Sequence, residues 1–137
     1  MTRRFRLIFN SHAARGRAWE TGSLLRSIAQ RHPEAEWAAT EHPSHATELA
    51  AEAAQQGFDV VAALGGDGTV HEVVNGLMRA PQGKRPLLGI VPIGSGNDFS
   101  ASMGVGREIE AAMERVFVGD PRWADLGRVV DGAGRQE

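Results

Sequence analysis

The 137-residue sequence predicts an α/β fold: a three-layer αβα arrangement in which helices cover both faces of an open, mostly parallel sheet. The first observation is an alternation along the chain, because short apolar stretches of strand length are followed by longer segments whose apolar residues recur at helical spacing. The second observation is that two glycine-rich loops each follow a predicted strand. Loops at the carboxyl ends of parallel strands line the ligand crevice of such sheets.

The first half of the chain contains two predicted strand–helix units. The first strand covers residues 4–10, and the helix after it covers residues 18–31 and ends before a proline. The second strand, at residues 34–40, is weaker. It precedes an alanine-rich helix that Ser44 is expected to cap and that Gly57 is expected to end.

The second half repeats this order. Residues 59–64 (DVVAAL) are continuously apolar, as expected for a strand buried on both faces of a parallel sheet, and residues 87–92 (LLGIVP) are predicted to be the next buried strand. Amphipathic helices are predicted over residues 69–80 and 107–118. A last short strand is expected from Pro121 onward.

Composition excludes several classes of function. Without cysteine the chain has no disulfide framework, no zinc–thiolate site and no cysteine nucleophile. A net charge of −2 gives no field that would recruit nucleic acid. The longest apolar runs are far shorter than the roughly 18 residues of a membrane span, and the N-terminus lacks the apolar stretch of a signal peptide. We therefore expect a cytoplasmic protein that does not bind nucleic acid.

The first glycine-rich loop lies in the segment LGGDGTVHEVVNG. Gly65, Gly66 and Gly68 surround one carboxylate, Asp67, and such glycines can take positive φ and form a nest of N–H groups for phosphate. A carboxylate there would repel phosphate unless Mg²⁺ lies between them, so Asp67 suggests an indirect Mg²⁺ ligand. The alternative is a tight turn with Asp67 as a turn residue. The loop matches neither the P-loop nor the dinucleotide fingerprint.

Thr69 and Glu72 have the T-x-x-E spacing of a capping box, which predicts that Thr69 begins the helix. The cap would still turn the Thr69 hydroxyl toward the crevice, where it could donate to phosphate. His71 is expected to be a partly exposed helix residue.

The second glycine-rich loop, PIGSGNDF, repeats this arrangement. Gly94, Ser95, Gly96, Asn97 and Asp98 place polar groups among glycines, although Asn97 or Asp98 could equally be a helix cap.

Two further sets of polar residues could belong to a site. Asn10 ends the first strand and would reach the same edge, or be only a strand-ending turn residue. His42, His45 and Glu48 have loosely metal-like spacing and are interpreted as loop and helix-start residues.

GGDGT followed by EVVNGL and then by PIGSGNDF resembles the diacylglycerol-kinase catalytic domain family, which includes bacterial lipid kinases and sphingosine kinases. GGDGT is also shared with NAD kinases and, in a related form, with phosphofructokinases. PIGSGNDF is the motif that narrows the resemblance to lipid kinases. It covers nearly the whole chain, from Asn10 to ADLGRV near the C-terminus. The resemblance implies the fold of an NAD-kinase/phosphofructokinase-like N-terminal domain.

The resemblance further implies transfer of the γ-phosphoryl group of ATP to a lipid hydroxyl such as that of diacylglycerol, with Mg²⁺ neutralising charge and Asp67 acting through the metal. The positions that would contact ATP or line its site are Asn10, Ser11, Thr40, Gly65, Gly66, Asp67, Gly68, Thr69, Glu72, Gly94, Ser95, Gly96, Asn97 and Asp98. Ser11, His71 and Ser95 depart from the family pattern, which has proline, asparagine and threonine there. Ser100 and Ala101 likewise replace the usual Ala-Arg.

Family members continue into a second, mainly β domain that supplies the catalytic base and much of the lipid site. We therefore expect a nucleotide-binding domain over residues 1–123 and the start of a connection over residues 124–137. Alone, the chain should bind nucleotide weakly and turn over poorly or not at all. Trp123, Leu126 and Val129 are expected to form an exposed apolar patch, which favours a homodimer.

A lipid acceptor also implies peripheral contact with the inner face of the membrane. Two rival interpretations stay open: an NAD-kinase-like small-molecule kinase and a non-catalytic nucleotide-binding module.

Overall fold

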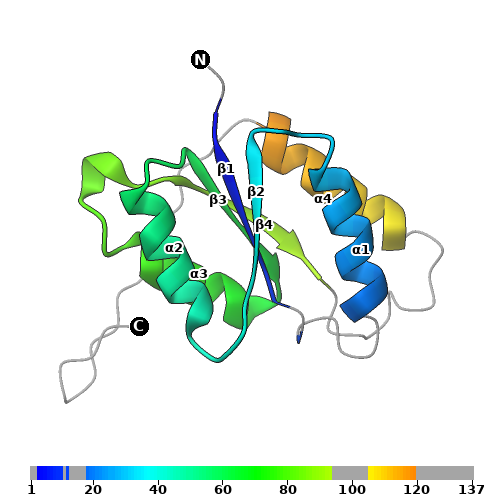
Figure 1. Cartoon of the computed structure of the whole chain (residues 1–137), viewed down its shortest axis with the longest axis horizontal. Coiled ribbons are helices and arrows are strands. Elements are labelled where there is room, and N and C mark those ends of the chain that lie inside the picture. Colours follow the sequence, from blue (N-terminus) through cyan, green and yellow to red (C-terminus); the bar gives the residue numbers. More distant parts are fainter. Residues whose placement is uncertain (1–2, 11, 13–17, 94–104, 120–137) are drawn as a thin grey trace.

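The computed structural model describes residues 3–10, 12, 18–93 and 105–119 and has the predicted α/β architecture (Figure 1). A four-stranded sheet has the order β2-β1-β3-β4, and all of its strand pairs are parallel. The strands are β1 (Phe5–Phe9), β2 (Ala35–Ala39), β3 (Val60–Gly65) and β4 (Leu87–Pro92). The helices are α1 (Ala18–Ala29), α2 (His45–Gln55), α3 (Asp67–Leu77), the short 3-10 helix η2 (Gln82–Lys84) and α4 (Val105–Val118).

Helices cover both faces of the sheet, which confirms the three layers (Figure 1). Alternate residues of β1 divide between two cores: Phe5, Leu7 and Phe9 pack with α1 and α4, whereas Ile8 packs with α2 and α3. A parallel sheet buried on both faces needs apolar residues at successive positions, and β1 and β3 have them. All six residues of β3 are buried, as predicted.

The prediction that residues 87–92 form a buried strand is wrong in its burial. Leu87, Leu88 and Ile90 are 38%, 38% and 47% exposed. β4 is the edge of the described sheet, and α4 packs against the face that carries Gly89 and Val91. The core formed with α2 and α3 holds no residue of β4, so Leu88 and Ile90 are left uncovered there. An apolar run indicates a strand, but it does not indicate whether that strand has a neighbour on each side.

The two ends of α2 differ from each other in how well they were predicted. Gly57 ends the helix as expected: its φ is 82°, its N–H donates to the Ala54 carbonyl at 3.3 Å, and the Phe58 N–H donates to the Ala53 carbonyl at 3.1 Å. This is the double hydrogen bond of a Schellman motif. Ser44 is at the N-cap position, but its φ is 69° and its side chain makes no capping hydrogen bond, so the predicted side-chain cap is wrong.

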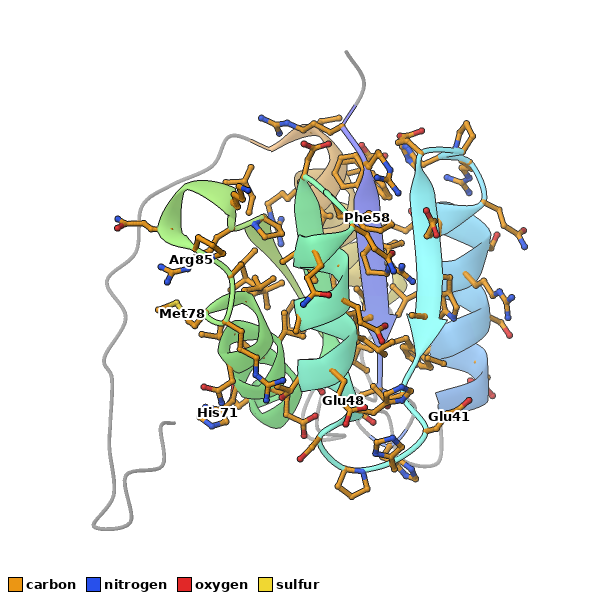
Figure 2. The ribbon with its side chains drawn as sticks, turned by 60° about the vertical axis from the view of Figure 1, so that its left-hand side comes forward. Glu41, Glu48, Phe58, His71, Met78 and Arg85 are labelled. Atoms are coloured by element: carbon orange, nitrogen blue, oxygen red, sulfur yellow. The ribbon has the colours of Figure 1, made fainter. Side chains whose placement is uncertain are left out.

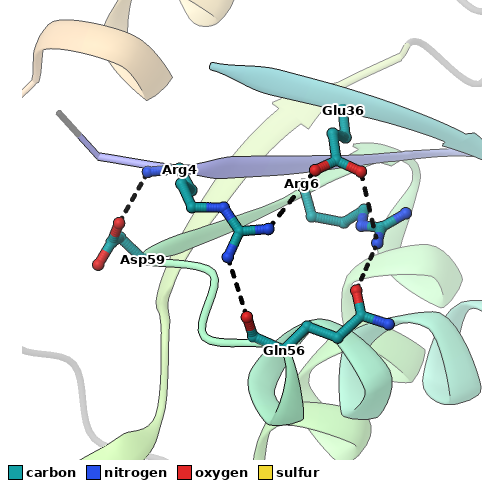
Figure 3. A network of polar contacts seen from close by, with 5 residues as sticks. All are labelled: Arg4, Arg6, Glu36, Gln56 and Asp59. Atoms are coloured by element: carbon teal, nitrogen blue, oxygen red, sulfur yellow. Dashed lines mark hydrogen bonds and ion pairs between the residues drawn. The ribbon is translucent and has the colours of Figure 1, made fainter.

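Polar contacts join three elements at the amino edge of the sheet (Figure 3). The Arg4 guanidinium donates to the Gln56 carbonyl at 2.9 Å, Arg6 donates to the Gln56 side chain at 3.0 Å, and the Arg4 N–H donates to Asp59 at 2.7 Å. Both guanidinium groups also lie over the Phe58 ring, at 4.2 Å and 4.6 Å from its centroid. These contacts tie the start of β1 to the end of α2 and the start of β3.

Among the residues that the structure describes, no helix has the length and apolar character needed to cross a bilayer.

Candidate functional site

The carboxyl ends of the four strands bring together residues that lie far apart in the sequence. Asn10 and Thr40 follow β1 and β2, and Gly65 is the last residue of β3. Backbone hydrogen bonds extend the sheet to this edge: Asn10 N–H donates to Leu64 at 3.0 Å, and Thr40 N–H donates to Phe9 at 2.9 Å. The structure therefore places Asn10, Thr40 and the first glycine-rich loop at one edge, as predicted.

The helix after β3 begins earlier than predicted. Gly66 is its N-cap, with φ −94° and ψ −165°, and the first intrahelical hydrogen bond runs from the Val70 N–H to the Gly66 carbonyl at 3.1 Å. Thr69 is therefore inside the first turn and cannot be the cap, so the predicted capping box with Glu72 is not formed. The chain passes from the strand into the helix within one residue, which leaves no loop for Thr69 to close.

Thr69 instead joins the helix to the first strand. The Asn10 side-chain amide donates to the Thr69 hydroxyl oxygen at 3.0 Å, and the Asn10 side-chain oxygen accepts the His12 N–H at 2.9 Å. Thr69 is 3% exposed and Asn10 is half-buried, so this hydrogen bond is part-buried. Asn10 is thus more than a strand-ending turn residue, because it holds the start of α3 against the end of β1.

The three glycines of the first loop provide room. A Cβ on Gly65 would lie 2.7 Å from Thr69 Cβ, so this position needs glycine for the helix to start so close to the strand. Gly66 and Gly68 have the opposite environment, because a Cβ on either would meet nothing within 4 Å. Neither has positive φ, since Gly57 is the one described glycine that does. The expected left-handed nest is therefore absent from the described loop, and its glycines leave an open surface at the helix start.

The start of α3 also has backbone N–H groups for which the described residues offer no acceptor. The N–H groups of Asp67, Gly68 and Thr69 precede the first intrahelical bond, and no acceptor in the described part of the chain bonds them. The N-terminus of a helix carries roughly half a positive charge, which favours an anion. Asp67 is exposed beside these donors, and no described residue forms the hydrogen bond that an Asx-type turn would require of its carboxylate.

The segment EVVNG after this loop has a structural role that sequence reasoning missed. Thr47 on α2 donates its hydroxyl to the Glu72 carbonyl at 2.9 Å. Four residues later, a Cβ on Gly76 would lie 2.7 Å from Ala50 Cβ. Gly76 therefore lets the backbone of α3 approach both the backbone and the Ala50 side chain of α2, and this pairing holds α3 in place behind the site. A glycine in the middle of an amphipathic helix was the available signal, because it costs helix stability unless packing requires it.

The remaining predicted residues divide into two sets. Thr40 and Glu72 are half-buried, and His71 is exposed on α3 as expected, where it accepts a hydrogen bond from Asn75 at 3.2 Å. Ser11 and the second glycine-rich loop, comprising Gly94, Ser95, Gly96, Asn97 and Asp98, lie outside the described residues. The residue before that loop, Ile93, donates its N–H to Gly65 at 3.1 Å, so the loop starts at the same edge.

Side chains that were interpreted as ordinary loop and helix-start residues also gather at this edge. His42, His45 and Glu48 follow the carboxyl end of β2 and begin α2, and their candidate ligand atoms all lie within 4.8 Å of one another. Figure 2 shows Glu48 and His71 at one end of the molecule and Phe58 at the other. Spacing alone suggested a cluster only weakly, and the turn at Ser44 is what brings the histidines together.

Comparison with known proteins identifies the family. The model of the diacylglycerol kinase catalytic domain matches residues 4–129. The chain belongs to the diacylglycerol kinase catalytic domain family. A diacylglycerol kinase from Bacillus subtilis (strain 168) is 42% identical over 125 residues, which make up 90% of this chain and 38% of the relative. One from Staphylococcus aureus (strain bovine RF122 / ET3-1) is 33% identical over 130 residues, or 94% of this chain and 41% of the relative.

A crystal structure of a diacylglycerol kinase from Bacillus anthracis str. Sterne has the same fold, with a TM-score of 0.62, 30% identity, and coverage of 81% of this chain and 42% of that one. This chain thus spans about two fifths of the length of the diacylglycerol kinases it matches. The family match over residues 4–129 includes both glycine-rich loops, Asn10 and Thr40.

Proposed function

We propose that this chain is the ATP-binding part of a lipid kinase that transfers the γ-phosphoryl group of ATP to the hydroxyl of a diacylglycerol-like lipid. The observation that carries the proposal is the start of α3 at the carboxyl edge of the sheet, where the N–H groups of residues 67–69 have no acceptor among the described residues and Asp67 and Gly68 are exposed. Phosphate is the anion that such helix starts commonly bind. Family membership supplies the reaction class.

In this proposal the chain contributes binding and orientation. The N–H groups of residues 67–69 would donate to phosphate oxygens, and the Thr69 hydroxyl, held by Asn10 at 3.0 Å, would keep its own hydrogen for a phosphate oxygen. Phosphoryl transfer depends mostly on such positioning and on charge neutralisation. Mg²⁺ would supply the neutralising charge, and the exposed Asp67 carboxylate is the oxygen donor that would hold it, directly or through water.

The domain boundaries form part of the same proposal. Residues 1–123 would bind the nucleotide, residues 124–137 would begin the connection to a second domain, and that domain would supply the catalytic base and much of the lipid site. The isolated chain would then bind ATP weakly and transfer phosphate poorly. Residues 124–137 fall outside the described residues, and so do Trp123, Leu126 and Val129, which were expected to form the apolar patch of a homodimer.

The test uses the gene product that carries this chain, with ATP labelled at its γ-phosphate and a panel of acceptors. We expect label in diacylglycerol presented in mixed micelles, Mg²⁺-dependent and absent when the lipid is omitted. Label in NAD without label in any lipid would overturn the proposal and favour the NAD-kinase-like rival. ATP binding without transfer to any acceptor would favour a non-catalytic nucleotide-binding module.

A further inference from the structure

Two imidazoles and a carboxylate meet at the start of α2. They lie at the carboxyl edge of the sheet, but none of them belongs to the proposed nucleotide site. One potential ligand atom from each of His42, His45 and Glu48 lies within 4.8 Å of the other two. His42 and Glu48 are exposed and His45 is half-buried. Glu48 also lines an open cleft of about 460 Å³ between α2 and α3, so the cluster can be reached from solvent.

The backbone between the two histidines is strained in a way that brings their rings together. Ser44 has φ 69° and is the one described residue other than glycine with positive φ. Such a conformation is uncommon for serine, and the Ser44 side chain makes no capping hydrogen bond that would account for it. Its consequence is that the His42 and His45 rings stack, with centroids 4.4 Å apart and planes 18° from parallel.

The hydrogen bonds of the rings decide which nitrogens are available. His42 Nδ1 lies 2.8 Å from the Pro43 carbonyl oxygen. A carbonyl can only accept, so Nδ1 carries the proton and Nε2 keeps a free lone pair. Metal-binding histidines are oriented in this way, with the other ring N–H donated to a carbonyl or carboxylate. His42 is therefore set to bind a metal through Nε2.

His45 requires one rearrangement. Its Nδ1 accepts the Glu41 N–H at 2.9 Å, which uses the lone pair of that nitrogen and leaves the proton of the neutral ring on Nε2. A metal bound at Nδ1 would replace the Glu41 N–H, and a metal bound at Nε2 would require a proton on Nδ1. In either case the Glu41 N–H loses its acceptor, which gives metal binding a local signature on the backbone.

We propose that His42, His45 and Glu48 form a binding site for a divalent transition metal ion, with Zn²⁺ as the ion that fits best. Two imidazoles and a carboxylate are the three protein ligands of one common class of zinc site, in which water takes a remaining position. Mg²⁺ prefers oxygen ligands, so this donor set separates the site from a magnesium site at Asp67. As stacked, the two rings lie in nearly parallel planes, so at least one imidazole must rotate before both direct a nitrogen lone pair at one ion, with metal–ligand bonds of about 2.0–2.2 Å. The exposed His42 side chain is free to make this rotation. The proposal does not depend on the proposed kinase function.

The first experiment measures Zn²⁺ affinity by competition with a chromophoric chelator, using tag-free protein in a buffer with excess Mg²⁺. We expect one high-affinity Zn²⁺ per chain. His42→Ala, His45→Ala and Glu48→Gln should each weaken it at least about tenfold, since even residues that only support a metal ligand cost roughly 10–100-fold. The matched control is His71→Ala, which removes an exposed histidine on α3 outside the cluster and should leave the affinity unchanged.

The second measurement follows the Glu41 amide by ¹H–¹⁵N NMR during the titration. Its resonance should shift as Zn²⁺ binds, and circular dichroism should show that the metal-free variants keep the fold, because His42 and Glu48 are exposed. The proposal is overturned if the His42 and Glu48 variants bind Zn²⁺ like the unmodified protein, if the His71 variant is the one that loses binding, or if the Glu41 amide does not move at saturation.

Discussion

Replacing Gly76 with alanine should destabilise the fold, although alanine is the better helix former. The added methyl group would lie 2.7 Å from Ala50 Cβ and 3.0 Å from the Ala51 nitrogen, and closer still to the Thr47 carbonyl oxygen. Ordinary contacts of this kind are about 3.5–4.0 Å, so α2 and α3 must separate by roughly 1 Å. Two of the three atoms belong to the α2 backbone, which cannot move aside as a flexible side chain would.

The magnitude follows from three contributions. Overpacking a well-packed interface costs about 1–3 kcal/mol. Separating the helices also weakens the hydrogen bond from the Thr47 hydroxyl to the Glu72 carbonyl, now 2.9 Å long, which is worth about 1 kcal/mol. Against these costs, alanine gains about 1 kcal/mol of helix propensity over glycine. The expected net loss is therefore about 1–3 kcal/mol, or roughly 3–5 °C in Tm for each kcal/mol in a chain of this size.

The assay is urea unfolding followed by circular dichroism, and Gly68→Ala is the matched control. It makes the same substitution in the same helix, but its Cβ meets nothing within 4 Å and its φ is not positive. The free energy of unfolding should therefore rise by about 0.4–1 kcal/mol in the control. A Gly76→Ala protein as stable as the Gly68→Ala protein would show that α2 and α3 do not pack as closely as the structure has them, and would refute the reasoning.

Three further predictions concern the start of α3. Gly68→Ala should weaken ATP binding while stabilising the fold, because its methyl group enters the open surface in front of the helix N-terminus. An unchanged ATP affinity in a binding titration would contradict phosphate binding at that surface. Asp67→Asn should reduce the gain in ATP affinity that Mg²⁺ provides. It should lower the free energy of unfolding by about 0.3–1 kcal/mol, the usual contribution of an acidic side chain in a first helical turn. An unaltered Mg²⁺ dependence of ATP binding would show that Asp67 does not act through the metal. Asn10→Ala and Thr69→Val should be coupled in a double-mutant cycle of unfolding free energies by about 0.5–1.5 kcal/mol, because the hydrogen bond between them is 3.0 Å long and part-buried; additive effects would argue against that bond.

The strands and helices were predictable because each is set by local apolar periodicity. β4 was predicted at its observed bounds, and α4 was predicted within two residues of its start. Each has a clear apolar pattern that ends at or next to a proline or glycine. The burial of β4 was mispredicted for a physical reason. An apolar run has the same composition in a central strand and in an edge strand, and only the strand order, which depends on distant parts of the chain, distinguishes the two.

The site was predictable in its position and less so in its contacts. Parallel strands place their carboxyl ends at one edge, so strand endings were enough to bring Asn10 and Gly65 together, whereas Thr40 was predicted only from the family resemblance. The bond from Asn10 to Thr69 joins residues 59 positions apart, and no local pattern contains it. The capping box failed for the same reason. Its spacing is correct, but α3 begins two residues earlier than predicted, directly after β3, and the Thr69 hydroxyl bonds to Asn10 instead.

The glycines around α3 therefore follow three different physical requirements, and only one of them concerns a ligand. Gly65 permits the close approach of Thr69 to the strand, and Gly76 permits the close approach of α2. Gly66 and Gly68 make neither contact. Gly66 is the N-cap, a position where glycine is preferred to alanine, whereas an alanine at Gly68, in the first helical turn, would stabilise the fold. Alanine is the better helix former and would fit at Gly68 without a clash. Stability therefore does not explain why glycine is present at this position. The N–H groups of residues 67–69 have no acceptor among the described residues, so the phosphate binding proposed above would account for glycine at position 68, and the ATP titration of Gly68→Ala tests that explanation.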